Sequence, residues 1–409
     1  MRKNAFSAGR QIHDPICATR NGSRWGAEVV TEWKLVVAAG GTGGHISPAL
    51  AIADHLVRID AACRIEFVCG TRPVELEIYR KAGIAPKTLE IERLIPGWRG
   101  LLTNIFHLRR AMKTARACLR QEQPRVVLGM GGYVCVPVVA AATTQRIPTI
   151  IHEQNAVAGR ANRWLSRRVK AIACAYPQAA RSFPAAKTRV TGNPVRPEFL
   201  GGDREAALRH WELAPNLPTL LVSGGSQGAR RLNQIVLDAL PVLERAAAAT
   251  GGLQILWSCG EQNFSDLKDR LQLKSRNSKL ETERLGVRLV PFIREMGLAY
   301  AVADLAFCRA GAMTLAELTA NGVPALLVPL PEAVANHQWL NGKPLADAGA
   351  AIVFKEPELD GRRFAGHVIG LLSNRAELNQ MREASRRLGR PDAVQKIATM
   401  ILELRGELP

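Results

Sequence analysis

Aromatic residues are sparse in this sequence, and its cysteines follow no metal-binding or disulfide pattern. Phe, Trp and Tyr supply 5% of the 409 residues, whereas Ala, Val, Leu and Gly are plentiful, a mixture that favours an α/β enzyme over a β-sandwich. The eight cysteines include no C-x-x-C pair and no zinc spacing, and most lie in apolar stretches. We therefore expect reduced thiols in a cytosolic protein, with no bound metal and no cofactor.

The sequence also lacks a secretory signal and a membrane-spanning run. No apolar segment follows the basic residues at the N-terminus, and the longest apolar stretch, residues 126–142, is short for a span and is interrupted by glycines and a proline. A hydrophobic content of 47% against 22% charged residues excludes a disordered chain, and the length favours two domains. The protein is expected not to cross a membrane, although it could lie against one.

Acidic residues are scarce in the first half of the chain. Residues 1–195 contain 29 Lys and Arg against 12 Asp and Glu, a net charge of +17, while residues 196–409 contain 26 against 24, a net charge of +2. This asymmetry predicts an anionic partner for the first half. Nucleic acid, a phosphorylated substrate and a membrane surface would each satisfy it.

The two halves begin in the same way, with a short apolar run that ends in a glycine-rich loop ahead of a helix. Residues 35–39 lead into GGTGGH at 40–45, and residues 219–222 lead into SGGSQGA at 223–229. Further apolar segments suited to buried parallel strands follow in each half. These are residues 65–68, 126–128, 149–151 and 171–173, and then residues 254–257, 287–290, 305–307 and 325–328.

This repetition predicts an α/β fold of two Rossmann-like domains with parallel sheets that face each other across a cleft. We expect a flexible extension at residues 1–33, a first domain at 34–195 and a second domain at 196–409, with a C-terminal helix that could pack back on the first domain. The join is placed near residues 193–197, where two prolines interrupt regular structure. Ligands of such sheets bind beyond the carboxyl ends of the strands.

Both glycine-rich loops could offer backbone N–H groups and a helix N-terminus to phosphate. Neither fits the dinucleotide fingerprint or the Walker motif, so each could equally be a tight turn. The first loop ends in His45, ahead of a helix expected to be capped by Ser47 with Pro48 at its first position. His45 suits a general base by type and place, and a histidine that only bonds nearby backbone is an equally good interpretation.

A helix with ligand-binding character is predicted after residues 309–314, ending at Asn321. Thr314 and Glu317 share a face in its first turn, where a carboxylate could accept hydrogen bonds from ribose hydroxyls. An acidic residue that merely complements the helix dipole is the alternative, and taken alone it is favoured. His337 and Gln338 could bind sugar hydroxyls or belong to an ordinary polar loop.

Cationic residues recur at helical spacing in two places in the first half. Such stripes are commonly solvated faces, but here they lie in a strongly basic half and one of them includes a tryptophan, which favours an anionic membrane surface. No helix-turn-helix or aromatic-rich reader of nucleic acid accompanies them. The stripes are Arg109, Lys113, Arg116 and Arg120, and then Arg160, Arg163, Trp164, Arg167, Arg168 and Lys170.

Six segments together resemble one enzyme family, in the same order and at nearly the same spacing. They are GGTGGH at 40–45, GMGGY at 129–133, HEQN at 152–155, GNPVR at 192–196, GGSQGA at 224–229 and CRAGAMT at 308–314. From about Lys34 to its end the sequence is similar to the MurG family, the UDP-N-acetylglucosamine:N-acetylmuramyl-(pentapeptide) pyrophosphoryl-undecaprenol N-acetylglucosamine transferases.

The resemblance implies a GT-B fold and an inverting glycosyltransferase. Such an enzyme moves GlcNAc from UDP-GlcNAc to the 4-hydroxyl of the muramyl sugar of lipid I, undecaprenyl-pyrophosphoryl-MurNAc-pentapeptide, and gives lipid II for peptidoglycan. The resemblance further implies a peripheral protein on the cytoplasmic face of the inner membrane. Its partners would be UDP-GlcNAc, lipid I, an anionic membrane surface and proteins of cell-wall synthesis and division, but not nucleic acid.

Roles for individual residues are implied in the same way. In the second domain the Ser226 loop would face the donor diphosphate, Glu317 the ribose and Ile293 the uracil. In the first domain the glycine loops would hold the acceptor, with His45 as the base and Asn155 nearby. The implied donor residues are Arg196, Ser226, Gln227, Ile293, Ala312, Met313, Thr314, Glu317, His337 and Gln338, and the implied acceptor residues are Gly41, Thr42, Gly43, Gly44, Gly131, Gly132 and Tyr133.

The sequence departs from the family pattern at Ala310, where serine is usual, at Met313, where leucine is usual, and at Gly342, where alanine is common. Two other interpretations remain open. A UDP-sugar 2-epimerase of the same fold would need a carboxylate in the cleft, and among the first-half loops Glu153 stands out for that role. A noncatalytic, basic nucleic-acid-binding protein would leave both glycine loops unexplained.

Overall fold

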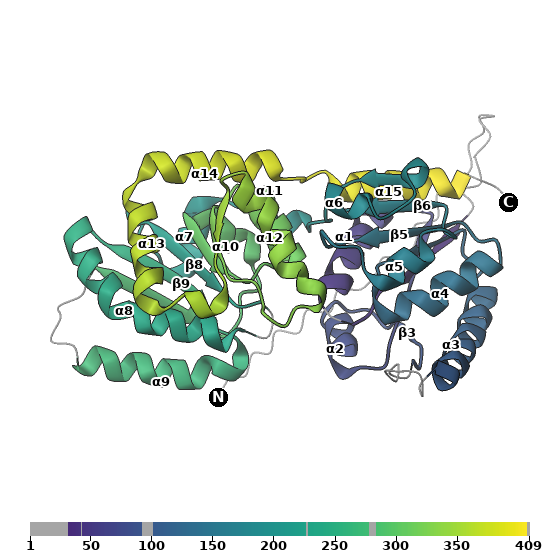
Figure 1. The fold of residues 1–409 in the computed structure, drawn as a ribbon, viewed down its shortest axis with the longest axis horizontal. Coiled ribbons are helices and arrows are strands. Elements are labelled where there is room, and N and C mark those ends of the chain that lie inside the picture. Colours follow the sequence, from purple (N-terminus) through teal and green to yellow (C-terminus); the bar gives the residue numbers. More distant parts are fainter. Residues whose placement is uncertain (1–31, 42, 92–100, 226–227, 278–283, 407–409) are drawn as a thin grey trace, which may run out of the picture. The chain divides into compact units, whose positions relative to one another are not determined.

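The computed structural model describes residues 32–41, 43–91, 101–225, 228–277 and 284–406. It contains two β-sheets, of seven and six strands, and neighbouring strands pair in parallel in both (Figure 1). The two Rossmann-like domains predicted from the sequence are therefore present. None of the helices in the described ranges is both long and apolar enough to cross a bilayer.

The first sheet has the strand order β3-β2-β1-β4-β5-β6-β7, so the order of winding reverses between β1 and β4. Ligands of open parallel sheets bind at such a switch point, beyond the carboxyl ends of the strands. The strands are β1 (Trp33–Ala38), β2 (Cys63–Cys69), β3 (Lys87–Thr88), β4 (Val126–Gly129), β5 (Thr149–Glu153), β6 (Ala171–Cys174) and β7 (Thr188–Val190). The helices are α1 (Gly43–Ile59), α2 (Pro73–Lys81), α3 (Leu101–Glu122), α4 (Gly132–Thr144), α5 (Arg160–Leu165) and α6 (Pro177–Ala180).

The second sheet repeats this winding with the order β10-β9-β8-β11-β12-β13, and its reversal lies between β8 and β11. The strands are β8 (Thr219–Ser223), β9 (Leu253–Ser258), β10 (Leu285–Val290), β11 (Leu305–Cys308), β12 (Ala325–Leu327) and β13 (Ala351–Val353). The helices are α7 (Arg204–Trp211), α8 (Arg230–Thr250), α9 (Glu261–Asn277), α10 (Met296–Val302), α11 (Ala312–Asn321), α12 (His337–Asp347), α13 (Gly361–Ser373), α14 (Arg375–Leu388) and α15 (Ala393–Gly406). Short 3₁₀ turns cover Ala185–Lys187, Pro197–Phe199, Val334–Asn336 and Glu356–Glu358.

The central strands are mainly apolar because helices cover both faces of each sheet. In β1, Leu35 and Val37 pack in one hydrophobic cluster with α1, whereas Val36 and Ala38 pack in another with α4. Successive side chains of a strand point to opposite faces, so a strand between two helical layers needs apolar residues at every position. This is why the central strands could be recognised as continuous apolar runs.

The structure corrects two boundaries at the start of the chain. Strand β1 begins at Trp33, whose side chain is buried and donates from Nε1 to Asp60, so the predicted extension at residues 1–33 overlaps the first strand. Helix α1 begins at Gly43 rather than after Ser47, and Pro48 lies inside it. Pro48 removes one hydrogen bond to the carbonyl of Gly44, a residue exposed enough for water to replace that bond.

The cysteines in the described part of the chain are free thiols, as the sequence predicted. Six of them are buried and Cys118 is partly exposed, while Cys17 lies outside the described residues. Burial raises the pKa of Cys135 and of Cys174 to about 12, because the thiolate would lose its hydration. These thiols act as small apolar core residues.

The last helix of the chain packs with the first sheet. Ile397, Met400, Ile401 and Leu404 of α15 are buried in the same cluster as Leu35 and Val37 of β1. Arg405 near its end binds Asp60, which follows α1. Figure 1 shows α15, in yellow, beside α1 and well away from α13 and α14, which precede it in the chain.

This packing makes the stability of the first domain depend on the C-terminus. Ile401→Ala removes fully buried methyl groups and should lower the free energy of unfolding by about 2–5 kcal/mol. Chemical denaturation, followed by the fluorescence of Trp33 against a Trp33→Phe reference, measures the effect on this core. The exposed Gln395→Ala on the same helix should change the free energy of unfolding by less than about 0.5 kcal/mol. Equal effects of the two variants would contradict the assignment of α15 to the first core.

Candidate functional site

The imidazole of His45 lies against glycines from two strand-end loops of the first sheet. His45 is the third residue of α1, just after the loop that follows β1. A Cβ atom at Gly41 would lie 3.7 Å from its Nδ1, one at Gly131 3.6 Å from its ring, and one at Gly132 3.7 Å from Cε1. Side chains at these positions would contact the ring, and the glycines leave that space free. Thr42 lies outside the described residues.

His45 has the charge state that a base requires. Burial is the largest effect on its pKa and lowers it below the ordinary histidine value; the Glu75 carboxylate raises it and His337 lowers it further. The ring is therefore mainly neutral at neutral pH. Its Nδ1 is buried without a hydrogen-bond partner. The alternative left open by the sequence, a histidine that braces the loop, would need a ring nitrogen bonded to nearby backbone, and Nδ1 makes no such bond.

The loop after β4 needs glycine for its backbone conformation. Gly131 has φ +83° and Gly132 φ +75°, in the left-handed region that other residues rarely adopt, and α4 starts at Gly132. Tyr133 follows, and its hydroxyl donates to Glu75 Oε1 at 2.5 Å. Tyr133 is therefore held on the side of α2, and the predicted acceptor residues Gly131, Gly132 and Tyr133 do meet His45 at one sheet edge.

Glu153, which the sequence offered as a second candidate base, is a structural carboxylate. It is almost fully buried at the end of β5, and its Oε1 accepts from the Asn155 amide N–H at 3.1 Å. Its Oε2 accepts from the Gly159 amide at 2.9 Å and from Asn162 Nδ2 at 2.8 Å. These donors bind both oxygens and hold the carboxylate inside its own loop. This geometry also removes the carboxylate that a 2-epimerase interpretation required.

His152, beside it, is also structural. It is fully buried, with Nε2 3.2 Å from the carbonyl oxygen of Gly192 and Nδ1 3.1 Å from Gln154 Nε2. Burial lowers its pKa to about 4, and the neighbouring His45 contributes in the same direction. Neutral His152 thus connects the end of β5 to the segment that leads out of the first domain.

Asn155 receives a hydrogen bond from the second half of the chain. Its Oδ1 accepts from Asn341 Nδ2 at 3.1 Å, and Asn341 Oδ1 accepts from the Ala156 amide at 2.8 Å. Asn193 donates from Nδ2 to the carbonyl oxygens of Gln154, at 3.0 Å, and Ala312, at 3.3 Å. Amide side chains therefore link the loop after β5 to α11 and α12, which carry predicted donor residues.

The N-terminus of α11 is a suitable place for a phosphate. Gly311 caps the helix in an extended conformation, and the next three residues, Ala312, Met313 and Thr314, are partly exposed. The N–H groups of a first helical turn have no partners within the helix. Arg309, before the helix, is instead paired with Glu356 at 2.5 Å and donates to the carbonyl of Val328, so it holds the loop.

Glu317 lies in the second turn of α11, not in the first turn as predicted, because α11 starts at Ala312. Its Oε2 accepts a hydrogen bond from the Tyr300 hydroxyl at 2.6 Å. Burial raises the pKa of Glu317 to about 7, against smaller opposite effects of the Tyr300 hydrogen bond and of Arg196. Arg196 has a buried Nε without a partner and lies 3.5 Å from Glu198. Glu317 and Arg196 thus lie close enough to interact, and the Nε of Arg196 has no hydrogen-bond partner.

The remaining predicted donor residues divide into three kinds. Ser226 and Gln227 lie outside the described residues. The side chain of Ile293 is buried, whereas Phe292 beside it is exposed. His337 Nδ1 lies 2.8 Å from the Val334 carbonyl, and Gln338 Oε1 accepts from the Leu330 amide at 2.9 Å. These two side chains stabilise the loop before α12 in the structure.

Glu75, Tyr300, Asn193 and Asn341 were not singled out for a role in the site from the sequence. Glu75 and Glu77 are two residues apart on one charged helix, and nothing local distinguishes the buried carboxylate from the one that pairs with Arg80. The position of Glu75 soon after β2 was the available signal, since polar residues close to a strand's carboxyl end approach the ligand edge.

The two cationic stripes lie on helices that cover one face of the first sheet. The predicted residues Arg109, Lys113, Arg116 and Arg120 of α3 and Arg163, Trp164 and Arg167 on and beside α5 are all exposed. Both helices pack with α4 in one hydrophobic cluster. Two large apolar side chains stand out between the cations, since Phe106 is 64% and Trp164 43% exposed. The combination is a basic surface with exposed aromatic groups.

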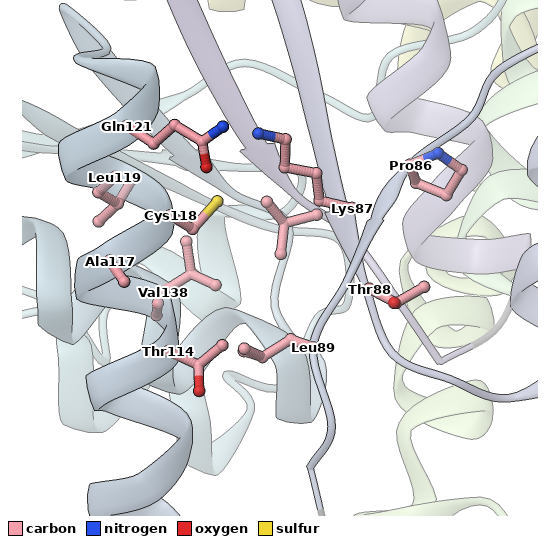
Figure 2. Close-up of a pocket in the computed structure, with 12 residues that line it drawn as sticks. Pro86, Lys87, Thr88, Leu89, Thr114, Ala117, Cys118, Leu119, Gln121 and Val138 are labelled. Carbon is pink, nitrogen blue, oxygen red and sulfur yellow. The ribbon is translucent and has the colours of Figure 1, made fainter.

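A cavity of about 570 Å³ lies at the edge of the first sheet, between β3, α3 and α4 (Figure 2). It contains none of the predicted site residues. Figure 2 shows Lys87 from β3 and Cys118 from α3 on opposite sides of it, and Lys87 binds Glu122. The further lining residues are Val68, Pro86, Thr88, Leu89, Thr114, Ala115, Ala117, Leu119, Gln121 and Val138.

Both halves of the chain match domains of one enzyme family. Residues 35–174 match the glycosyltransferase family 28 N-terminal domain, and residues 219–397 match the glycosyltransferase family 28 C-terminal domain. The first match contains the His45 and Gly131 loops, and the second contains α11 and α12.

Similar proteins extend over nearly the whole chain. A UDP-N-acetylglucosamine--N-acetylmuramyl-(pentapeptide) pyrophosphoryl-undecaprenol N-acetylglucosamine transferase of Anaeromyxobacter dehalogenans is 39% identical, over 91% of this chain and 93% of the relative. One with the same name from Listeria monocytogenes is 37% identical, over 91% and 99%. The crystal structure of MurG from Acinetobacter baumannii superimposes with a TM-score of 0.71 at 31% identity, over 91% and 99%. A UDP-GlcNAc 2-epimerase from Neisseria meningitidis shares the fold, with a TM-score of 0.57 at 16% identity, over 90% and 100%.

Proposed function

We infer the activity from one premise: the chain belongs to the MurG family of glycosyltransferase family 28, the UDP-N-acetylglucosamine–N-acetylmuramyl-(pentapeptide) pyrophosphoryl-undecaprenol N-acetylglucosamine transferases. It is a two-domain GT-B enzyme that transfers GlcNAc from UDP-GlcNAc to lipid I and gives lipid II in peptidoglycan synthesis. The transfer goes to the 4-hydroxyl of MurNAc with inversion at the sugar. Lipid I supplies the anionic diphosphate that suits the basic first half.

The placement of His45 is the observation that best supports this chemistry. A neutral imidazole lies at the switch point of the first sheet, bounded by glycines that leave its face open, with a buried Nδ1 that no protein group uses. A sugar hydroxyl is a weak nucleophile at neutral pH, so its attack is helped by a base within hydrogen-bond reach. His45 takes the proton of the 4-hydroxyl as that oxygen bonds to C1 of GlcNAc and the bond from C1 to UDP breaks.

The second domain supplies the groups that bind the donor. The first turn of α11, with Ala312, Met313 and Thr314, and the Ser226–Gln227 loop take the diphosphate and stabilise the charge that develops on the leaving group. Glu317 accepts hydrogen bonds from the ribose, and Arg196 beside it fixes that carboxylate. The loop around Ile293 meets the uracil, and His337 and Gln338 turn from their loop contacts to the donor sugar.

The first domain holds the acceptor. Its diphosphate binds at Gly41, Thr42, Gly43 and Gly44, where the loop after β1 meets α1, and the muramyl sugar lies over Gly131, Gly132 and Tyr133. Asn155 orients the acceptor, because its amide cannot take a proton but can bind a hydroxyl. Asn155 also accepts a hydrogen bond from Asn341 on α12, so the acceptor-binding loop is linked to the domain that binds the donor.

The basic surface of α3 and α5 holds the enzyme at the membrane that carries lipid I. Arginines and a lysine attract anionic headgroups, and Phe106 and Trp164 provide exposed aromatic groups suited to the lipid interface. We place the protein peripherally on the cytoplasmic face of the inner membrane, where UDP-GlcNAc is available, and in contact with proteins of cell-wall synthesis and division.

One assay distinguishes the proposed reaction from its alternatives. UDP release should require both UDP-GlcNAc and a lipid-linked MurNAc-pentapeptide, and the product should carry the added GlcNAc. A 2-epimerase would instead give the manno epimer without any acceptor. A nucleic-acid-binding protein would release no UDP in either case.

The role of Glu317 gives the first prediction of this section. Glu317→Ala should weaken UDP binding by about 1.5–3 kcal/mol, because hydrogen bonds to a charged acceptor are lost. Since the pKa of Glu317 is about 7 in the free protein, the binding form is deprotonated and affinity should fall as the pH drops from 8 to 6. Titration calorimetry measures both effects. Glu317→Gln corrects for protonation of UDP itself, and a pH dependence equal to that of the wild type would remove Glu317 from the site.

The proposed role of His45 as base gives a second prediction. His45→Ala should lower kcat by roughly 10²–10⁴, the usual contribution of a general base, with little change in the KM for UDP-GlcNAc, which binds the other domain. Steady-state kinetics with lipid I or a soluble analogue measure both constants. His45→Gln keeps a hydrogen-bonding group but cannot take the proton, so it should be as impaired. Near-normal kcat in that variant would show that His45 is not the base.

The basic surface of α3 and α5 gives a third prediction. The full-length protein should bind anionic vesicles, and replacing Arg109, Lys113, Arg116 and Arg120 by Gln should weaken binding by about 1 kcal/mol per cation. Flotation at increasing salt should show the loss of binding expected for screened charges. The control variant replaces four exposed cations of the second domain, Arg245, Lys268, Arg362 and Arg387. Equal flotation on neutral and anionic vesicles would refute the electrostatic contribution.

A further inference from the structure

A buried carboxylate on the acceptor side takes no part in the chemistry described above. Glu75 lies in the first turn of α2, soon after the end of β2, and its side chain is fully buried. Its Oε2 accepts a hydrogen bond from the Gly70 amide at 2.7 Å, and its Oε1 accepts one from the Tyr133 hydroxyl at 2.5 Å. One side chain thus joins the loop after β2 to the start of α4.

The same carboxylate reaches the loop that leads to His45. A Cβ atom at Gly40 would lie 2.8 Å from Glu75 Oε2, so the carboxylate packs against the backbone of this loop. Tyr79, one turn further along α2, donates its hydroxyl to the Ala39 carbonyl at 2.8 Å. Through these two side chains α2 contacts the loops after β1, β2 and β4, and the loops after β1 and β4 surround the His45 ring.

With the role of His45 as base taken from the proposed function, we propose that Glu75 is a positioning residue for the transfer reaction. It fixes the loops around the His45 imidazole, and its negative charge stabilises the imidazolium that forms when His45 accepts the proton of the sugar hydroxyl. Glu75 itself transfers no proton in this role. The arrangement resembles other sites in which a buried carboxylate supports a histidine base, although here the charge acts across the loop rather than through a direct bond.

The electrostatics around His45 show why such a charge is needed. Burial is the largest effect and disfavours the charged ring. His337 on α12 acts in the same direction. Glu75 opposes them and raises the pKa of His45. A base whose pKa falls too far below the working pH accepts a proton poorly, so Glu75 keeps His45 effective.

A histidine titration tests this role directly. Side-chain NMR spectra of the full-length protein are recorded from pH 4 to 8, and the His45 signal is identified by its absence in His45→Ala. Glu75→Gln keeps the shape of the side chain and removes its charge, so the pKa of His45 should fall. Glu77→Gln is the matched control, since Glu77 lies on the same helix but is partly exposed and paired with Arg80. It should leave the pKa of His45 unchanged.

Kinetics supply a second readout that a merely structural role would not change. In Glu75→Gln, kcat should fall about 10- to 100-fold, while the low-pH limb of the kcat profile should move to lower pH along with the pKa of His45. UDP affinity, measured by calorimetry, should stay at the wild-type value because the donor residues are in the other domain. General loosening of the fold would instead move the acid limb to higher pH and reduce UDP binding.

Two results would overturn the proposal: a wild-type pKa of His45 in Glu75→Gln, or a shifted pKa with unchanged kcat. If Glu75→Gln does not fold, Glu75→Asp is used instead. The shorter side chain keeps the charge but moves it away by one methylene. The pKa of His45 and kcat should then change in the same direction as in Glu75→Gln, but by less. Failure of the proposed function is recognised separately. Normal turnover in His45→Gln would refute His45 as base, whereas the titration reports the action of Glu75 on the ring whatever the turnover.

Discussion

A carboxylate enclosed in a protein must be surrounded by hydrogen-bond donors, and two such carboxylates shape the ligand edge of the first sheet. Glu153 collects N–H groups from its own loop, and Glu75 collects the Gly70 amide and the Tyr133 hydroxyl from two others. The loops they organise are rich in glycine and would otherwise have many accessible conformations. The open space around His45 exists because these anchors hold flexible backbone in place.

In the second domain, the loop at the corresponding sheet edge is held by a different interaction. Its loop after β11 is held by the ion pair of Arg309 with Glu356, and the first N–H groups of α11 follow that loop. Between the two halves, the bonds of Asn341 and Asn193 join neutral amides. Each such bond contributes only about 0.5–1.5 kcal/mol, so the contact can break and reform as substrates enter and products leave. Rigid anchoring within each half and exchangeable bonding between them suit an enzyme that brings two substrates together.

Much of the fold followed from apolar periodicity, because strands covered on both faces are apolar at every position. The strands β3, β7 and β13 were missed since runs of two or three residues carry no such pattern. The start of α1 was misplaced because Ser47 and Pro48 form a familiar helix start, yet the preceding glycines adopt helical geometry. His45 and Glu317 could be proposed from the sequence because motif and position point to them. The burial of Glu75 could not be predicted because only the tertiary structure distinguishes it from Glu77, and the hydrogen bonds of Glu153 could not be predicted because they depend on the conformation of its own loop.

The position of α15 has a consequence for how the chain is made. The first core includes side chains from the last few turns of the polypeptide, with the entire second domain encoded between them and β1. During synthesis at about 5–20 residues per second, the roughly 200 residues between β7 and α15 require about 10–40 s. Throughout that interval the apolar surface that will receive Ile397 and Ile401 has no cover. The first core is therefore completed only after α15 has been synthesised.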